Sequence, residues 1–228
     1  MNRIDVIQKI IYRKRAHTYL EIGVDGGTSF FPIKARQKIA VDPNFKFSKL
    51  RRIKWVFRNF YNVVAKYYEI TSDSYFADAK PCYLDVVFID GQHTYQQSLK
   101  DVRNSLNHLN EGGVIIMHDC SPPHKAAAYP ADSIDHAASL NLPGWTGEWC
   151  GDVWKTICYL RSHRKDLKIF VLDCDCGLGI VTRGEPDSCL SLTEGDLDIM
   201  TYDDLAKNRK RLLNLKDESF FFKFLETV

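Results

Sequence analysis

Residues 18–29 read TYLEIGVDGGTS and are the strongest indication of the fold class. Its first half has the apolar composition of a buried strand, and its second half is a turn rich in glycine. Glycine lets the backbone adopt positive φ angles and approach a ligand closely. A buried strand that runs into such a turn is typical of the first strand of a parallel sheet that binds a ligand at its carboxyl end.

The apolar segments around this stretch continue a pattern of alternating strands and helices. Strands are also predicted at residues 38–42, 67–70, 84–90 and 114–119, a hairpin at 167–173 and 177–182, and amphipathic helices at 3–15 and 95–109. Strands that alternate with helices form βαβ units and a mostly parallel sheet. We therefore predict an α/β fold: a Rossmann-like three-layer αβα sandwich with a mostly parallel seven-stranded sheet that ends in a C-terminal antiparallel hairpin.

The whole chain, residues 1–228, is predicted to form one domain. Its predicted parts are an N-terminal helix at 3–15, a core at 16–182, an insertion at 120–150 and a C-terminal helical region at 201–226. The insertion is rich in proline and glycine, which is typical of a lid or a binding loop. A short helix, disturbed by Pro32, is expected after the glycine-rich turn.

The composition is ordinary for a soluble globular protein, with 45% apolar, 12% aromatic and 26% charged residues. The cysteines are odd in number and irregularly spaced, and no signal peptide or apolar run of membrane length is present, so reduced thiols and a cytoplasmic location are predicted. They are Cys82, Cys120, Cys150, Cys158, Cys174, Cys176 and Cys189. Cys174 and Cys176 lack the paired spacing of a zinc site and are interpreted as strand cysteines.

Residues 45–62 mix basic and aromatic side chains and are predicted to be helical. Such a mixture can bind RNA by charge and stacking. It is more often a helix with a solvated basic face and an aromatic face toward the core. The formal net charge of only +2 favours this second interpretation, so nucleic acid is not a favoured partner.

Polar residues stand at the predicted carboxyl ends of the first three strands, where a ligand would bind. Glu21 ends the first strand, and Asp42, which ends the second, can accept hydrogen bonds from both hydroxyls of a ribose. The third strand ends in the polar residues 72–74, within reach of an adenine edge. A nicotinamide dinucleotide would require Gly-x-Gly-x-x-Gly, but Asp25 breaks that pattern and would repel a pyrophosphate. A cationic cofactor such as S-adenosylmethionine (SAM) suits these residues better, and the dinucleotide stays an alternative.

Glu-x-Gly-x-x-x-Gly at residues 21–27, with an acidic residue ending the second strand, resembles the signature of class I SAM-dependent methyltransferases. The runs FIDGQHTY at 88–95 and GGVIIMHD at 112–119 are similar to the group that contains macrolide-sugar O-methyltransferases and cephalosporin-biosynthesis relatives (methyltransferase family 24). The resemblance covers about residues 16–182.

The resemblance implies a set of cofactor-binding residues at the strand ends. The methionine and ribose side would be lined by Glu21, Gly23, Val24, Gly27, Thr28 and Ser29, with Asp90 nearby; Asp42 would hold the ribose, and Ser72, Asp73 and Ser74 the adenine. Each of these polar residues has a plainer interpretation as a turn or helix cap. The joint pattern favours the cofactor.

Asp90 and Asp119 end the fourth and fifth strands, which are expected to be neighbours. Two carboxylates at one sheet edge repel unless a proton or a cation lies between them. The resemblance implies a magnesium ion here, held by Asp90 and by an acidic-Asp pair on the fifth strand. His118 replaces the first acidic residue of that pair. The predicted metal set is Asp90, His118 and Asp119, with Mg, Mn or Fe as the candidate ion. Imidazole is a poor ligand for magnesium and a good one for manganese, iron or zinc, so whether a metal is required is left open.

His93 follows Asp90 by three residues, and the resemblance implies that it is the general base. A histidine can accept the proton of an attacking hydroxyl at neutral pH. The predicted function is therefore SAM-dependent O-methylation of a small hydroxylated acceptor, such as a sugar, with His93 as the base and with metal assistance left open.

Three alternatives remain at this stage. One is an oxidoreductase or hydroxylase with iron on His93, His118 and Asp119. The second is an NAD(P)-binding Rossmann enzyme. The third is a non-catalytic SAM-binding subunit. The apolar residues 220–225 leave a homo-oligomer open, and no membrane insertion is predicted.

Overall fold

The computed structural model describes residues 1–78 and 83–227; Cys82 lies outside the described residues. Its sheet has eight strands in the order β3-β2-β1-β4-β5-β7-β6-β8. They are β1 Thr18–Ile22, β2 Gln37–Val41, β3 Ala65–Tyr68, β4 Leu84–Ile89, β5 Leu109–Met117, β6 Leu167–Leu172, β7 Leu178–Arg183 and β8 Leu215–Lys216. Strand β7 is antiparallel to both of its neighbours, and the other pairs are parallel. The predicted sheet and hairpin are confirmed, and the two-residue β8 adds an eighth strand to the predicted seven.

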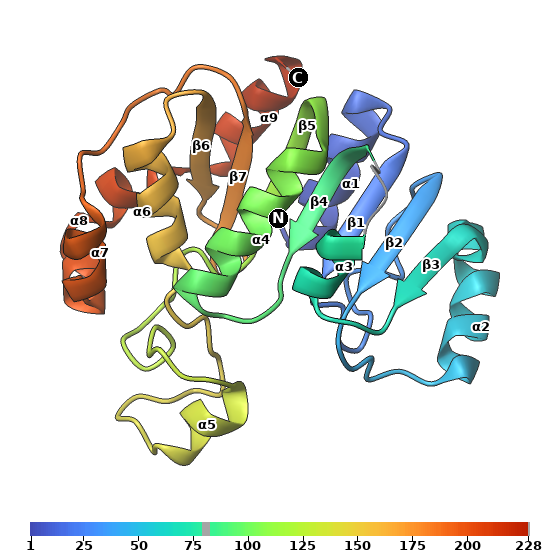
Figure 1. Ribbon diagram of the computed structural model, residues 1–228, viewed down its shortest axis with the longest axis horizontal. Helices are drawn as coiled ribbons and strands as arrows, with labels where there is room; N and C mark the ends of the chain where they lie inside the picture. The colour runs from blue at the N-terminus through green and yellow to red at the C-terminus, as the bar shows by residue number, and fades with distance from the viewer. Residues whose placement is uncertain (79–82, 228) are drawn as a thin grey trace.

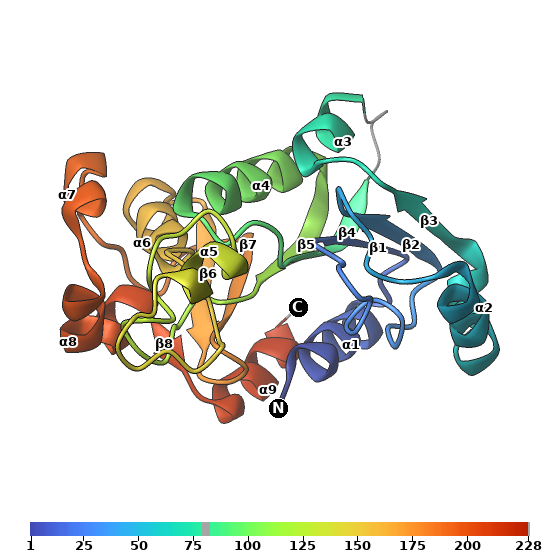
Figure 2. The same ribbon diagram turned by 90° about the horizontal axis from the view of Figure 1, so that it is seen from below.

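Helices cover both faces of this sheet, as the predicted three-layer fold requires. They are α1 Arg3–Lys14, α2 Lys49–Arg58, the 3₁₀ helix η1 Phe60–Val64, α3 Ser72–Asp78, α4 Tyr95–His108, α5 Ile134–Ser139, α6 Trp154–His163, α7 Glu194–Ile199, α8 Tyr202–Leu213 and α9 Glu218–Thr227. Figure 2 shows α3, α4 and α6 on one face, and α1 and α9 on the other. None of the helices in the described ranges is long and apolar enough to cross a membrane.

The apolar residues of each central strand serve two cores, one on either face. Successive side chains of a strand point to opposite faces, so a strand covered on both sides is apolar throughout. In β4, Val87 and Ile89 pack in the core on the α4 side. Val86 and Phe88 pack in the core on the side of α1 and α9.

The predicted N-terminal helix is present as α1, and its sequence explains both of its ends. The Asn2 side chain accepts a hydrogen bond from the backbone of Asp5, whose side chain in turn accepts one from Asn2. Ile7 and Ile10 bury the inner face. Arg15 ends the helix in a left-handed conformation, with φ of 51°.

The prediction of a short helix after the glycine-rich turn is wrong, because residues 23–36 form turns and irregular backbone. Pro32 lacks an N–H and disfavours a helix here. The backbone carbonyls of residues 30–33 are instead satisfied by buried side chains. The Lys38 ammonium donates to the carbonyls of Phe30 (2.6 Å) and Ile33 (2.8 Å) and to Asn62 Oδ1 (2.7 Å). The side-chain amides of Asn59 and Asn62 donate to three carbonyls within residues 31–33.

A Lys38→Met variant should therefore lose about 3 kcal/mol of unfolding free energy, because three hydrogen bonds to buried acceptors are lost, although the Ile33 carbonyl keeps its bond from Asn59. The measurement is urea denaturation. Lys34→Met is the matched control, since the Lys34 side chain is exposed. Equal stability of the two variants would contradict this explanation of the segment.

Three other expectations differ in detail. The predicted helix at 45–62 is divided at Asn59 into α2 and η1. Its predicted aromatic core face is present in part: Phe45, Phe47 and Trp55 pack against the core, whereas Phe57 is exposed. The third strand is Ala65–Tyr68, two residues before its predicted place. Strand β5 starts at Leu109 rather than after Gly113, because an irregularity in its register with β4 absorbs the residues between.

The insertion at 120–150 lies beyond the carboxyl ends of the parallel strands. In Figure 1 the arrowheads of β2, β3 and β4 point toward the side where this segment and its helix α5 lie. The backbone amides of Cys150 and Gly151 both donate to the Ala127 carbonyl, at 2.8 and 3.0 Å, so the two ends of the insertion are joined.

Candidate active site

The strand order reverses between β1 and β4, which is where open α/β sheets bind ligands. The turns that follow these two strands are in direct contact. Gly23 has a φ of +82°, and a Cβ atom at this position would lie 2.0 Å from the backbone oxygen of Asp90. Glycine is therefore required at position 23 on two grounds, its positive φ and the close approach of the Asp90 backbone.

Asp42, the predicted ribose ligand, joins the glycine-rich turn to the end of β2. Its Oδ2 accepts a hydrogen bond from the Asp25 amide at 2.8 Å, and its Oδ1 from the Asn44 amide at 2.7 Å. Asp25 also forms an ion pair with Lys46, at 2.9 Å. The structure thus places Asp42 beside the predicted cofactor turn, with the carboxylate oriented by backbone.

The predicted adenine residues begin α3, next to α4. The Ser72 hydroxyl is buried and donates to Asp101 Oδ1 at 2.6 Å, and burial raises the pKa of Asp101 to about 6. Asp73 forms an ion pair with Lys100 at 2.6 Å, and Ser74 is exposed. Asp73 and Ser74 therefore reach the surface, whereas the buried Ser72 hydroxyl is occupied by its hydrogen bond to Asp101.

Glu21 and Ser29 form a buried pair rather than an exposed lining. Glu21 has no exposed surface; its Oε1 accepts from the Ser29 hydroxyl at 2.6 Å, and its Oε2 accepts from Tyr19. Among the other predicted turn residues, Val24 and Gly27 are buried and Thr28 is exposed. Glu21 thus stabilises the start of the glycine-rich turn through its hydrogen bond with Ser29, and its carboxyl group does not face solvent.

Burial raises the pKa of Glu21 from 4.5 to about 7, and the hydrogen bonds from Ser29 and Tyr19 only partly oppose this. Between these pH values the folded protein holds a proton that the unfolded chain has released, so the stability contributed by Glu21 falls as the pH rises from 4.5 through 7. The wild type should lose about 3 kcal/mol relative to Glu21→Gln across this interval.

The measurement is urea denaturation of both proteins at several pH values. A stability difference that stays constant, or that moves in favour of the wild type as the pH rises, would mean that Glu21 is folded as a carboxylate paired with the charge of Lys38.

The predicted chemical residues meet beyond the ends of β4 and β5. His118 Nδ1 lies 3.0 Å from Asp119 Oδ2 and 3.2 Å from Asp90 Oδ1. His93 Nε2 lies 3.3 Å from Asp119 Oδ2 and 3.6 Å from Asp90 Oδ1. The structure therefore brings together the predicted base and all three predicted metal ligands.

The two histidines His118 and His93 offset the negative charge of these carboxylates. Burial alone would lower the pKa of His118, but Asp90, Asp119 and Asp175 outweigh it and raise the pKa to about 12. Burial likewise opposes a raised pKa at His93, yet Asp90 and Asp119 raise it. The pKa of Asp90 is held well below its usual range, because the two histidines outweigh the effect of its burial. At neutral pH, His118 is therefore an imidazolium ion.

Arg3 and Asp175 complete this cluster and were missed by the sequence reasoning. Arg3 Nη1 donates to Asp90 Oδ2 at 2.9 Å, and Nη2 donates to Asp175 Oδ1 at 3.0 Å. Asp175 also lies 3.4 Å from His118 Nε2. No motif marks Arg3, and the only signal for Asp175 was the polar turn between two apolar strands.

Cys150 and Cys176 also lie next to Asp119. One ligand atom from each of these three residues lies within 4.8 Å of the others. Asp119, Asp175 and Cys176 all have positive φ angles, of 61°, 48° and 57°. Such conformations are uncommon outside glycine and tend to occur at functional sites.

The described cysteines form no disulfide bond. A hydrogen bond from the Cys150 thiol lowers the pKa of Cys176, although burial opposes it. The same contact and burial raise the pKa of Cys150. The sequence spacing had disfavoured a metal on Cys174 and Cys176, and the structure pairs Cys176 with Cys150 instead.

Residues 20–120 match the family model of a methyltransferase domain. Among curated proteins, none is significantly similar in sequence to this chain.

Several solved structures with the same fold are named as methyltransferases. A putative O-methyltransferase from Klebsiella pneumoniae is 13% identical, with a TM-score of 0.57 over 80% of each chain. TomG from Streptomyces achromogenes, an O-methyltransferase involved in tomaymycin synthesis and solved with SAM, is 12% identical, with a TM-score of 0.55 over 78% of each chain.

The Podospora anserina methyltransferase PaMTH1, solved with S-adenosylhomocysteine (SAH), is 16% identical, with a TM-score of 0.54 over 81% of this chain and 80% of its own. These similarities confirm the predicted fold, and the family match over residues 20–120 agrees with the resemblance inferred from the sequence.

Proposed function

We propose that this protein transfers the methyl group of SAM to a hydroxyl group of a small-molecule acceptor. The observation that carries the proposal is the position of His93. Its Nε2 lies 3.3 Å from Asp119 and 3.6 Å from Asp90, beyond the strand ends and next to the point where the strand order reverses. A proton acceptor would thus lie at the edge of the sheet where the cofactor would bind.

The cofactor would lie across the ends of β1 and β2. The Asp42 carboxylate has two backbone donors, so it is already oriented and keeps lone pairs for the ribose hydroxyls. Asp73 and Ser74 are the accessible candidates for the adenine. Asp90 lies beside the glycine-rich turn and would favour the positive charges of the methionine part of SAM.

His93 would accept the proton of the acceptor hydroxyl. Its Nδ1 lies 2.8 Å from the Trp149 carbonyl, which can only accept, so Nδ1 carries a hydrogen and Nε2 is the basic nitrogen of the neutral ring. Once Nε2 is protonated, Asp119 and Asp90 stabilise the imidazolium. Trp149 stacks on the His93 ring, with ring centroids 5.0 Å apart, and so anchors the insertion to the base.

A metal ion could assist the proposed reaction, but the rest of the proposal does not depend on it. Asp90, His118 and Asp119 would hold a divalent ion such as Mg, Mn or Fe, and the ion would lower the pKa of an acceptor hydroxyl. Their ligand atoms lie within 4.8 Å of one another, and the buried His118 Nδ1 makes no hydrogen bond of acceptable geometry with the described residues. The fit requires His118 to lose its proton and Arg3 to release Asp90. Proton transfer to His93 does not need the ion.

The iron-dependent hydroxylase stays a second candidate, because His93 and His118 both lie within 3.3 Å of Asp119 Oδ2. Two histidines and one carboxylate are the ligands of many non-haem iron oxygenases. That candidate predicts iron in the purified protein and turnover that depends on oxygen.

The experiment for the proposed reaction uses SAM with a ¹³C-labelled methyl group and a mixed library of alcohols, phenols and sugars. New ¹³C signals at the chemical shift of O-methyl groups, formed only with the protein present, are expected. Label transferred to nitrogen or carbon instead would contradict O-methylation.

A further inference from the structure

We propose that Asp119, Cys150 and Cys176 form a binding site for a thiophilic divalent cation, with zinc as its preferred occupant. This site is distinct from the Asp90–His118–Asp119 set and shares only Asp119 with it. Metal binding here can be measured without methyl transfer, so the inference does not depend on the proposed reaction.

The backbone fixes all three ligands close together. The amide of Ser121 donates to the Cys176 carbonyl at 2.8 Å, and the amide of Cys120 donates to the Gly177 carbonyl at 3.0 Å. These bonds hold the β6–β7 turn against the segment that follows β5. A Cβ atom on Gly151 would lie 1.8 Å from the His93 carbonyl, so the chain around Cys150 also packs tightly against the site.

The donor types favour zinc over magnesium. Two thiols and one carboxylate are common zinc ligands, whereas magnesium prefers oxygen ligands alone. Tetrahedral zinc places its ligand atoms about 3.3–3.8 Å apart, so atoms already within 4.8 Å of one another need only small side-chain adjustments. Three protein ligands leave one coordination position open, and binding releases the thiol protons to solvent.

The charges around the two ligand sets also favour a cation at the set of Asp119, Cys150 and Cys176. The Asp90 carboxylate already has the Arg3 guanidinium at 2.9 Å and the His118 ring at 3.2 Å. Asp119 also has the rings of His118 and His93 nearby, at 3.0 and 3.3 Å, but no arginine or lysine among the described residues forms an ion pair with it, so Arg3 is the cation that distinguishes Asp90 from Asp119. A cation is therefore better accommodated between Asp119 and the two sulfurs than beside Asp90.

The test uses reduced, metal-stripped protein titrated with Co²⁺, whose bonds to thiolates give an intense charge-transfer absorption. This absorption should appear in the wild type, disappear on addition of Zn²⁺, and be lost in Cys150→Ser and Cys176→Ser. Cys189→Ser is the matched control, because Cys189 is exposed and outside the site. Asp90→Asn should keep the absorption and so separates the two ligand sets.

Absence of the absorption from the wild type, or its presence in both cysteine variants, would overturn the proposal. So would its loss in Asp90→Asn with retention in the cysteine variants. Cys176 lies half-buried in a turn, so Cys176→Ser is expected to fold even if Cys150→Ser does not. Titration of SAM into the same samples reports separately on the proposed cofactor.

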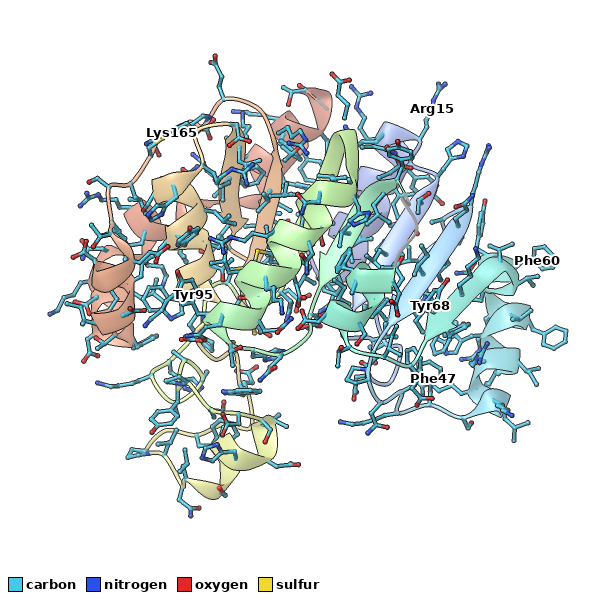
Figure 3. All side chains as sticks on the ribbon, in the orientation of Figure 1. Arg15, Phe47, Phe60, Tyr68, Tyr95 and Lys165 are labelled. Carbon is cyan, nitrogen blue, oxygen red and sulfur yellow. The ribbon has the colours of Figure 1, made fainter. Side chains whose placement is uncertain are left out.

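A second inference concerns an exposed surface on α2 and η1, which we call the basic apolar patch. Its large apolar side chains are Leu50, Ile53, Phe57, Phe60, Val63 and Val64, with exposed fractions of 76, 53, 86, 79, 52 and 49%. Its basic residues are Lys49, Arg51, Arg52, Lys54 and Arg58. In Figure 3, Phe60 points outward, away from the sheet.

We infer that the basic apolar patch docks on an anionic lipid surface. An amphipathic helix with basic and apolar residues is typical of helices that lie in the membrane interface. Helix α2 contains five basic residues and no acidic one, so two copies of the patch would repel each other. Leu50, Ile53 and Val63 do not stack on nucleic-acid bases, which favours lipid over RNA.

Co-sedimentation with phosphatidylcholine vesicles, with and without phosphatidylserine, tests this inference. Binding is expected only with phosphatidylserine, weakening with salt and falling at least about tenfold in a Phe57→Ser, Phe60→Ser double variant. Phe222→Ser is the matched control, because Phe222 is 49% exposed on α9.

Three results would overturn lipid docking. One is equal binding to neutral vesicles or no binding to either kind. The second is binding of a single-stranded RNA oligonucleotide without vesicle binding. The third is a concentration-dependent dimer that the double variant abolishes.

Discussion

A Gly23→Ala variant is expected to lose at least about 3 kcal/mol of unfolding free energy, and to lose SAM binding in whatever fraction still folds. Alanine at this position would have to keep a φ of +82°, and its Cβ would lie 2.0 Å from the Asp90 backbone oxygen. The clash is with backbone, so no side-chain rotation relieves it. The turns after β1 and β4 would have to separate, and both turns are part of the proposed cofactor site.

Gly26→Ala is the matched control, because a Cβ there has no neighbour within 4 Å. It should stay within about 0.5 kcal/mol of the wild type and bind SAM normally. Chemical denaturation and SAM titration of both variants provide the comparison. If Gly23→Ala is as stable as Gly26→Ala, the close contact of the two turns is wrong.

A His93→Gln variant is expected to form SAH about 10²- to 10⁴-fold more slowly while it binds SAM with nearly unchanged affinity. Glutamine keeps a polar side chain of similar reach but cannot accept a proton at neutral pH. The measurement is single-turnover SAH formation with an acceptor found in the ¹³C screen. His136→Gln on the exposed helix α5 is the matched control and should keep full activity.

A loss of less than about tenfold in His93→Gln would assign the base to another group. The same variant addresses the non-catalytic alternative. A SAM-binding subunit that only supports a catalytic partner would show no loss of rate in the assembled system.

The sequence predicted the fold well where local composition decides it. Residues 18–22 and 84–89 are mostly apolar because both faces of their strands are covered, and this pattern can be read without a structure. The grouping of Asp90, His93, His118 and Asp119 was also predictable. Carboxyl ends of neighbouring parallel strands must meet at one edge of the sheet.

The rest depends on contacts between distant parts of the chain. The segment 23–36 is irregular because Lys38, Asn59 and Asn62 satisfy its carbonyls, and no local pattern reveals such partners. Arg3 reaches Asp90 from α1 across 87 positions of sequence. Cys150 and Cys176 meet only because the insertion and the β6–β7 turn both pack against the end of β5.

The most direct test of the central claim is calorimetric titration of purified protein with SAM, with NAD⁺ as the comparison ligand. SAM should bind in the micromolar range and NAD⁺ should give no heat. Asp42→Ala should weaken SAM binding about 10- to 100-fold, because two hydrogen bonds to the ribose would be lost. Absence of SAM binding would contradict the account. Tighter binding of NAD⁺ than of SAM would also contradict it, and would favour the dinucleotide alternative.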